Sequence, residues 1–287
     1  MYALLTGIDF GVVLKIDLLH LTVVVSLLIL LPIIGGIRLA IIAKVSGLVP
    51  SYKQGICARG ASQFVALTTP ATAGAQVIKA FWIKKLNGGW DLGFGVAYLE
   101  ISFDVFLVNI VAMIASLVSL LNGDVRVIPV IFLSLYTMGS FSLLFIATGV
   151  KKLRKAILRI FEKLKIPLKE THLENFAKSL TNLVKNPKEL IITILLTITY
   201  LITQGMVVLV IANAFGENMS LLGIIIFAAI IQVMGGIPIP GGAIGVEYGA
   251  SLFLRPEIVV TWRVISYFGS LLFTFALFQV FMLRYVK

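Results

Sequence analysis

The long apolar segments of this 287-residue chain contain a few ionisable side chains, and these are the first candidates for chemistry. A charge in the hydrocarbon of a membrane costs about 3 kcal/mol or more, so a residue of this kind is a functional candidate by default. Glu100 and Asp104 are four residues apart and therefore share one face of a helix. The candidates are Arg38, Arg59, Lys79, Glu100, Asp104, Glu247 and Arg263.

Two interpretations of these charges remain open. They could form internal ion pairs, such as Arg59 with Glu100, that hold a helical bundle together. Alternatively they bind a substrate, in which case the carboxylates would hold a cationic head group or a coupling proton. For Arg38 and Lys79 we expect that the side chain simply reaches the membrane interface, because long basic side chains extend towards water.

Two breaks rich in proline and glycine lie inside apolar segments, and both suit phosphate binding. Helices that start after Gly74 and Gly242 would present free backbone N–H groups and the positive end of the helix dipole. Threonine hydroxyls in the first break and the guanidinium of Arg59 add donors for a phosphate. The predicted substrate-binding residues are Arg59, Thr69, Pro70, Thr72, Gly74, Lys79, Glu100, Asp104, Pro238, Pro240, Gly241, Gly242 and Glu247.

The composition indicates which elements must position these residues. Hydrophobic residues make up 59% of the chain and charged residues 13%, which is too little charge to cover a soluble domain. Several apolar runs are long enough to cross about 30 Å of hydrocarbon. The predicted fold is therefore an all-α, polytopic, integral membrane bundle. Its predicted spans are Leu18–Ile42, Trp90–Leu121, Val127–Thr148, Glu189–Ala214 and Glu257–Val286.

Two further apolar segments, Gln54–Leu86 and Ser220–Leu254, are interrupted. Proline removes a backbone donor and glycine lowers helix propensity, so a helix should stop near Pro70 and again between Pro238 and Gly242. Each segment is predicted to be a re-entrant hairpin of two half-helices, whose tip needs protein or a wet cavity around its backbone. Kinked spans of a structural bundle are the alternative.

The segment 149–188 carries eleven basic residues against three glutamates. Its amphipathic pattern favours helices on an anionic membrane surface at the cytoplasmic side, with a docking platform for another protein as the alternative. Threading the chain from this loop makes 15–148 a first repeat with an extra span and 189–287 a second, inverted repeat. The hairpins then enter from opposite faces, and the C-terminus is cytoplasmic. Residues 1–287 are predicted to form one membrane domain.

Several classes of protein are not expected. Cys57 is the single cysteine, and His20 and His172 have no cysteine near them in sequence, so no disulfide, metal site or cofactor is predicted. The net charge of +11 comes largely from basic residues in loops beside the spans, which indicates membrane topology rather than nucleic-acid binding. Charged residues interrupt the N-terminal segment, so it is not predicted to be a secretory signal.

Three patches resemble a known family. They are Arg59-Gly60-Ala61-Ser62-Gln63-Phe64 running to Thr69-Pro70-Ala71-Thr72-Ala73-Gly74, then Glu100 with Asp104, then Pro238-Ile239-Pro240-Gly241-Gly242-Ala243-Ile244-Gly245-Val246-Glu247. Over nearly the whole chain they resemble the transmembrane flippase-like domain of bacterial lysyl-phosphatidylglycerol synthase and its stand-alone bacterial and archaeal relatives. The resemblance implies movement of aminoacylated phosphatidylglycerol between leaflets. Related domains accompany archaeal glycosyltransferases that use polyprenyl phosphates.

The chain departs from that family in two respects. Lys79 stands where the family often has an arginine, and Ala73-Gly74 replaces a richer glycine run. No soluble aminoacyl-transferase domain is present, so we do not expect this chain alone to synthesise the lipid.

The predicted function is translocation of a phospholipid or a lipid-linked phosphate head group across the cytoplasmic membrane, with the head group handled at the hairpin tips. The expected partners are a phospholipid or polyprenyl-phosphate-linked lipid, the anionic membrane surface, and a separate synthase or glycosyltransferase. A non-transporting scaffold for such an enzyme and an ion-coupled carrier of a small anion are the alternatives. An enzyme is not expected. An intramembrane serine protease needs a Gly-x-Ser-Gly motif with a histidine, and His20 has no such partner. An intramembrane aspartyl protease needs an aspartate in a Gly-x-Gly-Asp motif, and Asp104 is not in one.

Overall fold

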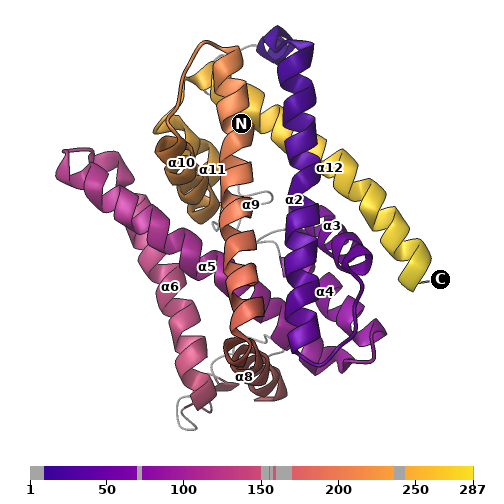
Figure 1. Cartoon of the computed structure of the whole chain (residues 1–287). Coiled ribbons are helices and arrows are strands. Elements are labelled where there is room, and N and C mark those ends of the chain that lie inside the picture. The colour runs from indigo at the N-terminus through magenta and orange to yellow at the C-terminus, as the bar shows by residue number, and fades with distance from the viewer. Residues whose placement is uncertain are drawn as a thin grey trace.

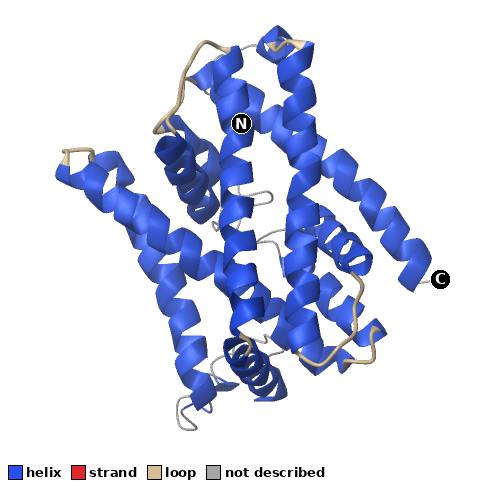
Figure 2. Cartoon of the chain, in the orientation of Figure 1, coloured by secondary structure: helices blue, strands red, loops and turns tan. Residues whose placement is uncertain are grey.

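The computed structural model describes residues 10–69, 73–149, 155, 158–159, 170–235 and 243–286 of the chain. Within these ranges every regular element is a helix and no strand occurs, which confirms the all-α prediction (Figure 2). The helices are η1 (Phe10–Lys15), α2 (Leu18–Val45), α3 (Tyr52–Thr68), α4 (Ala73–Lys85), α5 (Gly89–Leu121), η3 (Val125–Val127), α6 (Ile128–Gly149), α8 (Glu170–Lys185), α9 (Pro187–Ala214), α10 (Leu221–Met234), α11 (Ala243–Ser251) and α12 (Pro256–Tyr285) (Figure 1).

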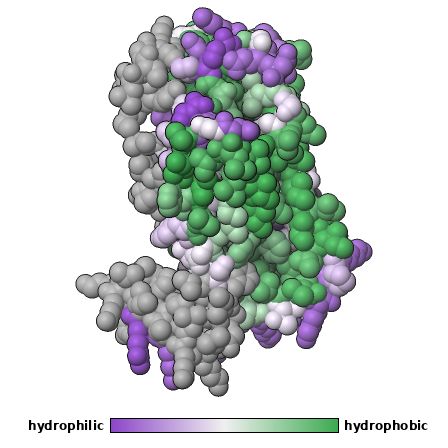
Figure 3. All heavy atoms as spheres, turned by 90° about the vertical axis from the view of Figure 1, so that its left-hand side faces the viewer, coloured by the Kyte–Doolittle hydropathy of each residue, from purple (hydrophilic) through white to green (hydrophobic). Residues whose placement is uncertain are grey.

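Five helical segments are long and apolar enough to cross a membrane. They belong to α2, α5, α9, α12 and the stretch of η3 and α6 between Val125 and Ser142. The helices α2, α5, α6, α9 and α12 begin and end within three residues of the predicted spans, which are therefore confirmed as long apolar helices. Hydrophobic atoms cover the middle of the face drawn in Figure 3, and hydrophilic atoms gather towards its two ends. This distribution matches a hydrocarbon layer with water on either side.

Side-chain caps set where several helices begin. The Asp17 carboxylate accepts a hydrogen bond from the backbone N–H of His20 at the start of α2. Ser51 and Gln54 form a reciprocal capping box at the start of α3. The helices α9 and α12 begin with proline, whose fixed φ angle suits the first helical position. The ends of the elements therefore follow from local sequence.

The two interrupted segments each form a pair of short helices, as expected from their breaks. The helices α3, α4, α10 and α11 have 17, 13, 14 and 9 residues. At about 1.5 Å per residue each is shorter than a hydrocarbon core of about 30 Å. The two members of each pair pack against one another. The predicted tip residues Pro70, Thr72, Pro238, Pro240, Gly241 and Gly242 lie outside the described residues.

The helices α2 and α9 lie side by side in the centre of the molecule (Figure 1). Each of them also approaches one short helix at a glycine. A Cβ atom on Gly36 of α2 would lie 2.3 Å from Cα of Ile56 in α3, and one on Gly205 of α9 would lie 2.6 Å from the carbonyl oxygen of Ile224 in α10. Only glycine permits these contacts, which bring the backbones together as in other membrane bundles.

The basic segment differs from the prediction in one respect. Its second helix, α8, packs its apolar face against α5 and buries Leu173, Phe176 and Leu183 in the protein. Asn182 adds a hydrogen bond from its side-chain amide to the carbonyl oxygen of Val45. This apolar face is therefore covered by protein and is not free to lie on a membrane surface, because helix packing buries the same stripe that a lipid surface would cover.

Candidate functional site

A buried carboxylate on α5 lies at the centre of a group of charged side chains. Glu100 is fully buried, and its Oε1 accepts hydrogen bonds from Nη2 of Arg38 at 2.5 Å and from Nη1 of Arg59 at 3.1 Å. Its Oε2 accepts a hydrogen bond from Nζ of Lys79 at 2.5 Å. The three cations come from α2, α3 and α4, so one carboxylate joins four helices.

Asp104, one turn further along α5, completes the binding of Arg38. Its carboxylate accepts two parallel bonds from the Arg38 guanidinium, at 2.5 and 2.7 Å, and Thr197 of α9 accepts a third at 2.9 Å. The ring of Tyr200 lies 6.0 Å from Cζ of Arg38 and 5.6 Å from Cζ of Arg59. Bidentate geometry and an aromatic face both stabilise a guanidinium. Thr197 and Tyr200 both belong to α9, so this helix contacts the same group of charges.

We name Arg38, Arg59, Lys79, Glu100 and Asp104 the charge cluster. It contains three cations and two carboxylates, and therefore carries one net positive charge when all five are ionised. The predicted ion pair of Arg59 with Glu100 is present. A buried cluster usually balances its charges, because an unpaired charge away from water is costly. A bound anion would balance the excess positive charge of this cluster.

The expectation that Arg38 and Lys79 reach the membrane interface is wrong. Arg38 is 0% exposed and Lys79 is 2% exposed, and both are held in the interior by carboxylates of α5. The reason is the short distance to Glu100, since a paired charge gains more from a buried carboxylate than from extending its stem to the surface.

Arg59 is the most loosely bound of the three cations. Its side chain is 13% exposed, compared with 1% for Arg38, and its bonds to Glu100 are 3.1 and 3.5 Å long. The absence of a side chain at Gly35 leaves room for it, because a Cβ there would lie 2.8 Å from Nε of Arg59. Arg59 can therefore turn towards a ligand without breaking the rest of the charge cluster.

A cavity of about 390 Å³ opens beside the charge cluster. Arg59, Lys79 and Asp104 line it, together with Tyr200. Four glutamines from four different helices line it as well: Gln63 of α3, Gln76 of α4, Gln204 of α9 and Gln232 of α10. Helices from both halves of the chain therefore line the cavity, and amides and charged groups stand among apolar residues in its wall.

The other predicted site residues are placed differently. The Thr69 hydroxyl donates a hydrogen bond to the carbonyl oxygen of Val65 at 2.7 Å, and Gly74 packs against the same residues, so both shape the end of the first pair of short helices. Glu247 of α11 does not line the cavity; it interacts electrostatically with Arg263 of α12. The structure thus brings Arg59, Lys79, Glu100 and Asp104 together and leaves Glu247 apart.

Neutral polar residues are the part of the site that sequence reasoning missed. The four glutamines, Thr197 and Tyr200 carry no charge, so a search for ionisable groups in apolar segments passes over them. The signal that would have found them is an amide inside a membrane-spanning or half-spanning helix, where an unpaired polar group is also costly.

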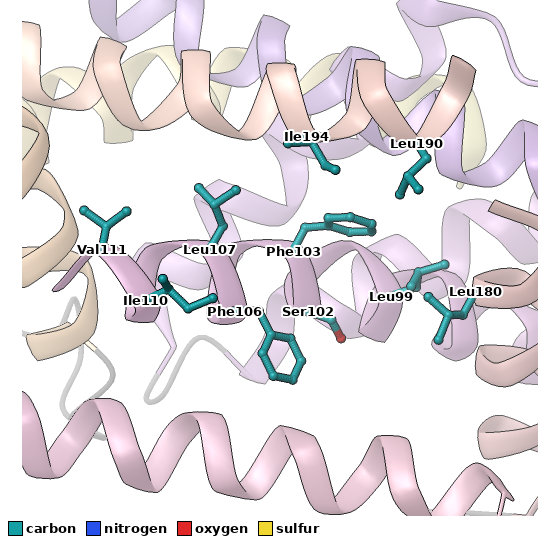
Figure 4. A pocket seen from close by; sticks show the side chains of 10 residues that line it. All are labelled: Leu99, Ser102, Phe103, Phe106, Leu107, Ile110, Val111, Leu180, Leu190 and Ile194. Carbon is teal, nitrogen blue, oxygen red and sulfur yellow. The ribbon is translucent and has the colours of Figure 1, made fainter. Parts of the chain in front are cut away.

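An apolar pocket of about 440 Å³ lies on the other face of α5 (Figure 4). Leu99, Phe103 and Leu107 of α5 line it with Leu190 and Ile194 of α9. Helical periodicity explains the division, because Asp104 and Val108 line the cavity from one side of α5 while Ser102 and Phe106, two residues earlier in each case, line the pocket from the opposite side. One helix therefore separates a charged cavity from a hydrophobic pocket.

No group of three or more metal-ligating side chains occurs in the part of the chain that the structure describes. The cavity is lined by two cations, the Asp104 carboxylate, several amides and one aromatic ring, a set that suits a phosphate or hydroxyl groups.

No curated protein and no solved structure matches the chain. A protein-family model does match it, described as the lysylphosphatidylglycerol synthase TM region, over residues 2–273. That family is embedded in membranes and is associated with lipid handling, in agreement with the five long apolar helices. The match covers nearly all of the sequence, so the chain belongs to the lysylphosphatidylglycerol synthase TM region family.

Proposed function

We propose that the chain moves a phosphate-bearing lipid head group between the leaflets of the cell membrane. The observation that carries the proposal is the position of α5 between a cationic cavity and an apolar pocket. An amphipathic ligand needs both environments, one for its phosphate and one for its chains. A small anion would need only the cavity, so the arrangement favours a lipid over a carrier of small anions.

An inverted repeat would give such a transporter two equivalent halves, and the packing of the helices supports such a repeat. If α2, α3, α4 and α5 correspond to α9, α10, α11 and α12, each contact within the first set has a counterpart in the second. The contact of α3 with α12 is likewise matched by the contact of α10 with α5, and α2 packs on α9. The paired helices also have similar lengths, with 28 residues in α2 and α9 and with 33 and 30 in α5 and α12.

Two pairs of residues support the same correspondence. Gly36 and Gly205 each bring a long helix close to the backbone of a short one, and Gln63 and Gln232 both line the cavity. The members of each pair are 169 residues apart in the chain. A pseudo-two-fold axis in the membrane plane would place both glutamines near the middle of the membrane. Binding sites lie there in transporters built from inverted repeats.

We further propose that the pairs α3–α4 and α10–α11 are re-entrant hairpins that enter from opposite faces. The ends of α3 and α4 that lie away from the interruption point towards the lower part of Figure 1, where α8 lies. The corresponding ends of α10 and α11 point towards the upper part. The basic segment 149–188 and the C-terminus would then face the cytoplasm, because basic loops are retained there. The head group would pass between the hairpins while its chains stay in apolar surroundings.

Lipid movement in this account needs no bond to be made or broken. Fixed cations and amides replace the water that a phosphate loses in the membrane, so the barrier falls without a catalytic group. The chain would act on a phospholipid or a polyprenyl-phosphate-linked lipid that a separate synthase or glycosyltransferase makes.

The proposal is tested by reconstituting the full chain into vesicles that contain a trace of acyl-labelled phosphatidylglycerol. A membrane-impermeant reductant bleaches the label in the outer leaflet only. We expect the bleached fraction to rise beyond half in vesicles with protein and to stay near half in vesicles without it. Equal bleaching in both preparations contradicts the proposal.

A further inference from the structure

The described residues that line the cavity carry more positive than negative charge, and this limits the head group that it can take. Arg59, Lys79 and Asp104 line the cavity, whereas Arg38 and Glu100 are bonded to them without lining it. No other charged residue lines the cavity within the described ranges. The segments 70–72 and 236–242 contain no ionisable side chain, so they leave this charge count unchanged.

A bound phosphodiester would balance the excess cation of the charge cluster. An aminoacylated head group would not, because its ammonium groups offset the charge of its own phosphate. A lysyl ester carries up to two such groups, and the carboxylates that would have to bind them already hold Arg38, Arg59 and Lys79. Like charges in a site of low dielectric repel strongly, so the cavity disfavours a cationic head group.

The four glutamines supply a second, independent observation. The amide oxygen of each is buried, and none accepts a hydrogen bond from a described residue. A buried polar atom without a partner is costly, so each of these oxygens needs a donor from a ligand or from water. A hydroxyl group both donates and accepts, and therefore satisfies an amide in either orientation.

We infer that the cavity binds an anionic phosphodiester head group rich in hydroxyl groups, and that it selects against aminoacylated or other cationic head groups. The inference rests on the proposed function and names its class of substrate. Two lipids share this chemistry: one with a glycerol head group, such as phosphatidylglycerol, and one with a sugar phosphate on a polyprenyl chain. The phosphate pairs with Arg59 and Lys79, and the hydroxyl groups bond to the glutamines on the surrounding helices.

The test compares lipids on the unaltered full chain. Vesicles contain a trace of acyl-labelled phosphatidylglycerol, phosphatidylcholine or lysyl-phosphatidylglycerol, and a further set contains a labelled polyprenyl-phosphate-linked hexose. We expect at least one of the two hydroxyl-rich anionic lipids to move about 10-fold faster or more than the lysyl and choline lipids. The lysyl lipid is disfavoured by its ammonium groups, and the choline lipid has no hydroxyl group to bond to the amides. Whichever of the two moves faster identifies the source of the head group.

Paired variants connect that preference with the amides. In Gln63→Leu/Gln232→Leu we expect the rate for the preferred lipid to fall about 10-fold, because one hydrogen bond at each site is lost. Gln279→Leu is the matched control, since Gln279 is exposed on α12 away from the cavity, and its rate should equal that of the unaltered chain. Gln63→Asn keeps the amide if the leucine variant fails to insert, and its rate should lie between the two.

The possible outcomes separate this inference from the proposed function. Faster movement of the lysyl lipid than of both anionic lipids overturns the inference and leaves lipid movement intact. Equal rates for all lipids, with no effect of the glutamine variants, also overturn it and show that water satisfies the amides. If no lipid moves faster than in protein-free vesicles, the proposed function itself is wrong.

Discussion

Replacement of Glu100 by glutamine should destabilise the fold far more than the loss of an ordinary surface charge. The carboxylate is fully buried and accepts hydrogen bonds from Arg38, Arg59 and Lys79. Glu100→Gln raises the net charge of the charge cluster from +1 to +2 and turns an amide donor towards at least one cation. Removal of one partner from a buried ion pair costs about 3–5 kcal/mol, and we expect a loss in that range in the free energy of unfolding.

The assay is reversible denaturation of the purified protein in mixed micelles. Lys79→Met in the Glu100→Gln background removes one positive charge and returns the net charge to +1. The double variant should therefore be more stable than the sum of the two single losses predicts, with a coupling energy of roughly 1–3 kcal/mol. Glu257→Gln is the matched control, because Glu257 is exposed in the first turn of α12 and its loss should cost under about 1 kcal/mol.

Two results would refute the reasoning. A loss for Glu100→Gln no larger than that for Glu257→Gln would mean that the carboxylate is not the centre of a buried ion cluster. Strict additivity of Glu100→Gln and Lys79→Met would mean that the 2.5 Å contact between the two side chains carries no energetic coupling.

Further predictions concern packing and topology. Gly36→Ala should lower the free energy of unfolding by about 1–3 kcal/mol or more because its Cβ would overlap the α3 backbone, whereas Gly139→Ala should be neutral or stabilising, since nothing lies within 4 Å of that position; equal effects in a denaturation assay would contradict the close contact. In a background without the native cysteine, Asn122→Cys and Asn218→Cys should react with an impermeant maleimide from outside the cell, and Lys185→Cys only after permeabilisation. Labelling of Asn218→Cys and Lys185→Cys from the same side would rule out the inverted repeat.

The long helices could be predicted from sequence because apolar length and helix-breaking residues are local properties. The interruptions at Pro70 and near Pro240 correctly indicated that α3 and α10 end early. The spacing of Glu100 and Asp104 correctly indicated that they share one face of α5, and the pair of Arg59 with Glu100 followed from opposite charge in neighbouring apolar segments.

The rest of the site depends on distances between helices, which local sequence patterns do not reveal. Arg38 and Lys79 were expected at the interface because their stems are long, yet the positions of α2 and α4 beside α5 bring both to Glu100. Gln63 and Gln232 are neutral and far apart in sequence, so only the packing of α3 and α10 around one cavity reveals them. The docking of α8 on α5 was missed for the same reason, because protein and lipid cover an apolar stripe equally well.

The central claim is that a lipid phosphate passes through the cationic cavity, and Arg59→Gln tests it most directly. Arg59 lines the cavity and is the most loosely bound cation of the charge cluster, so its loss should remove a ligand contact while the fold is retained. The measurement is the initial rate of phosphatidylglycerol movement in vesicles with matched amounts of inserted protein. The control is Arg126→Gln, whose side chain is 61% exposed beside Asp124. A charge-assisted hydrogen bond to phosphate is worth a factor of about 10–100 in rate, so Arg59→Gln should be slower than the unaltered chain by that factor and Arg126→Gln unchanged. Equal rates for Arg59→Gln and Arg126→Gln would show that the phosphate does not pass through this cavity.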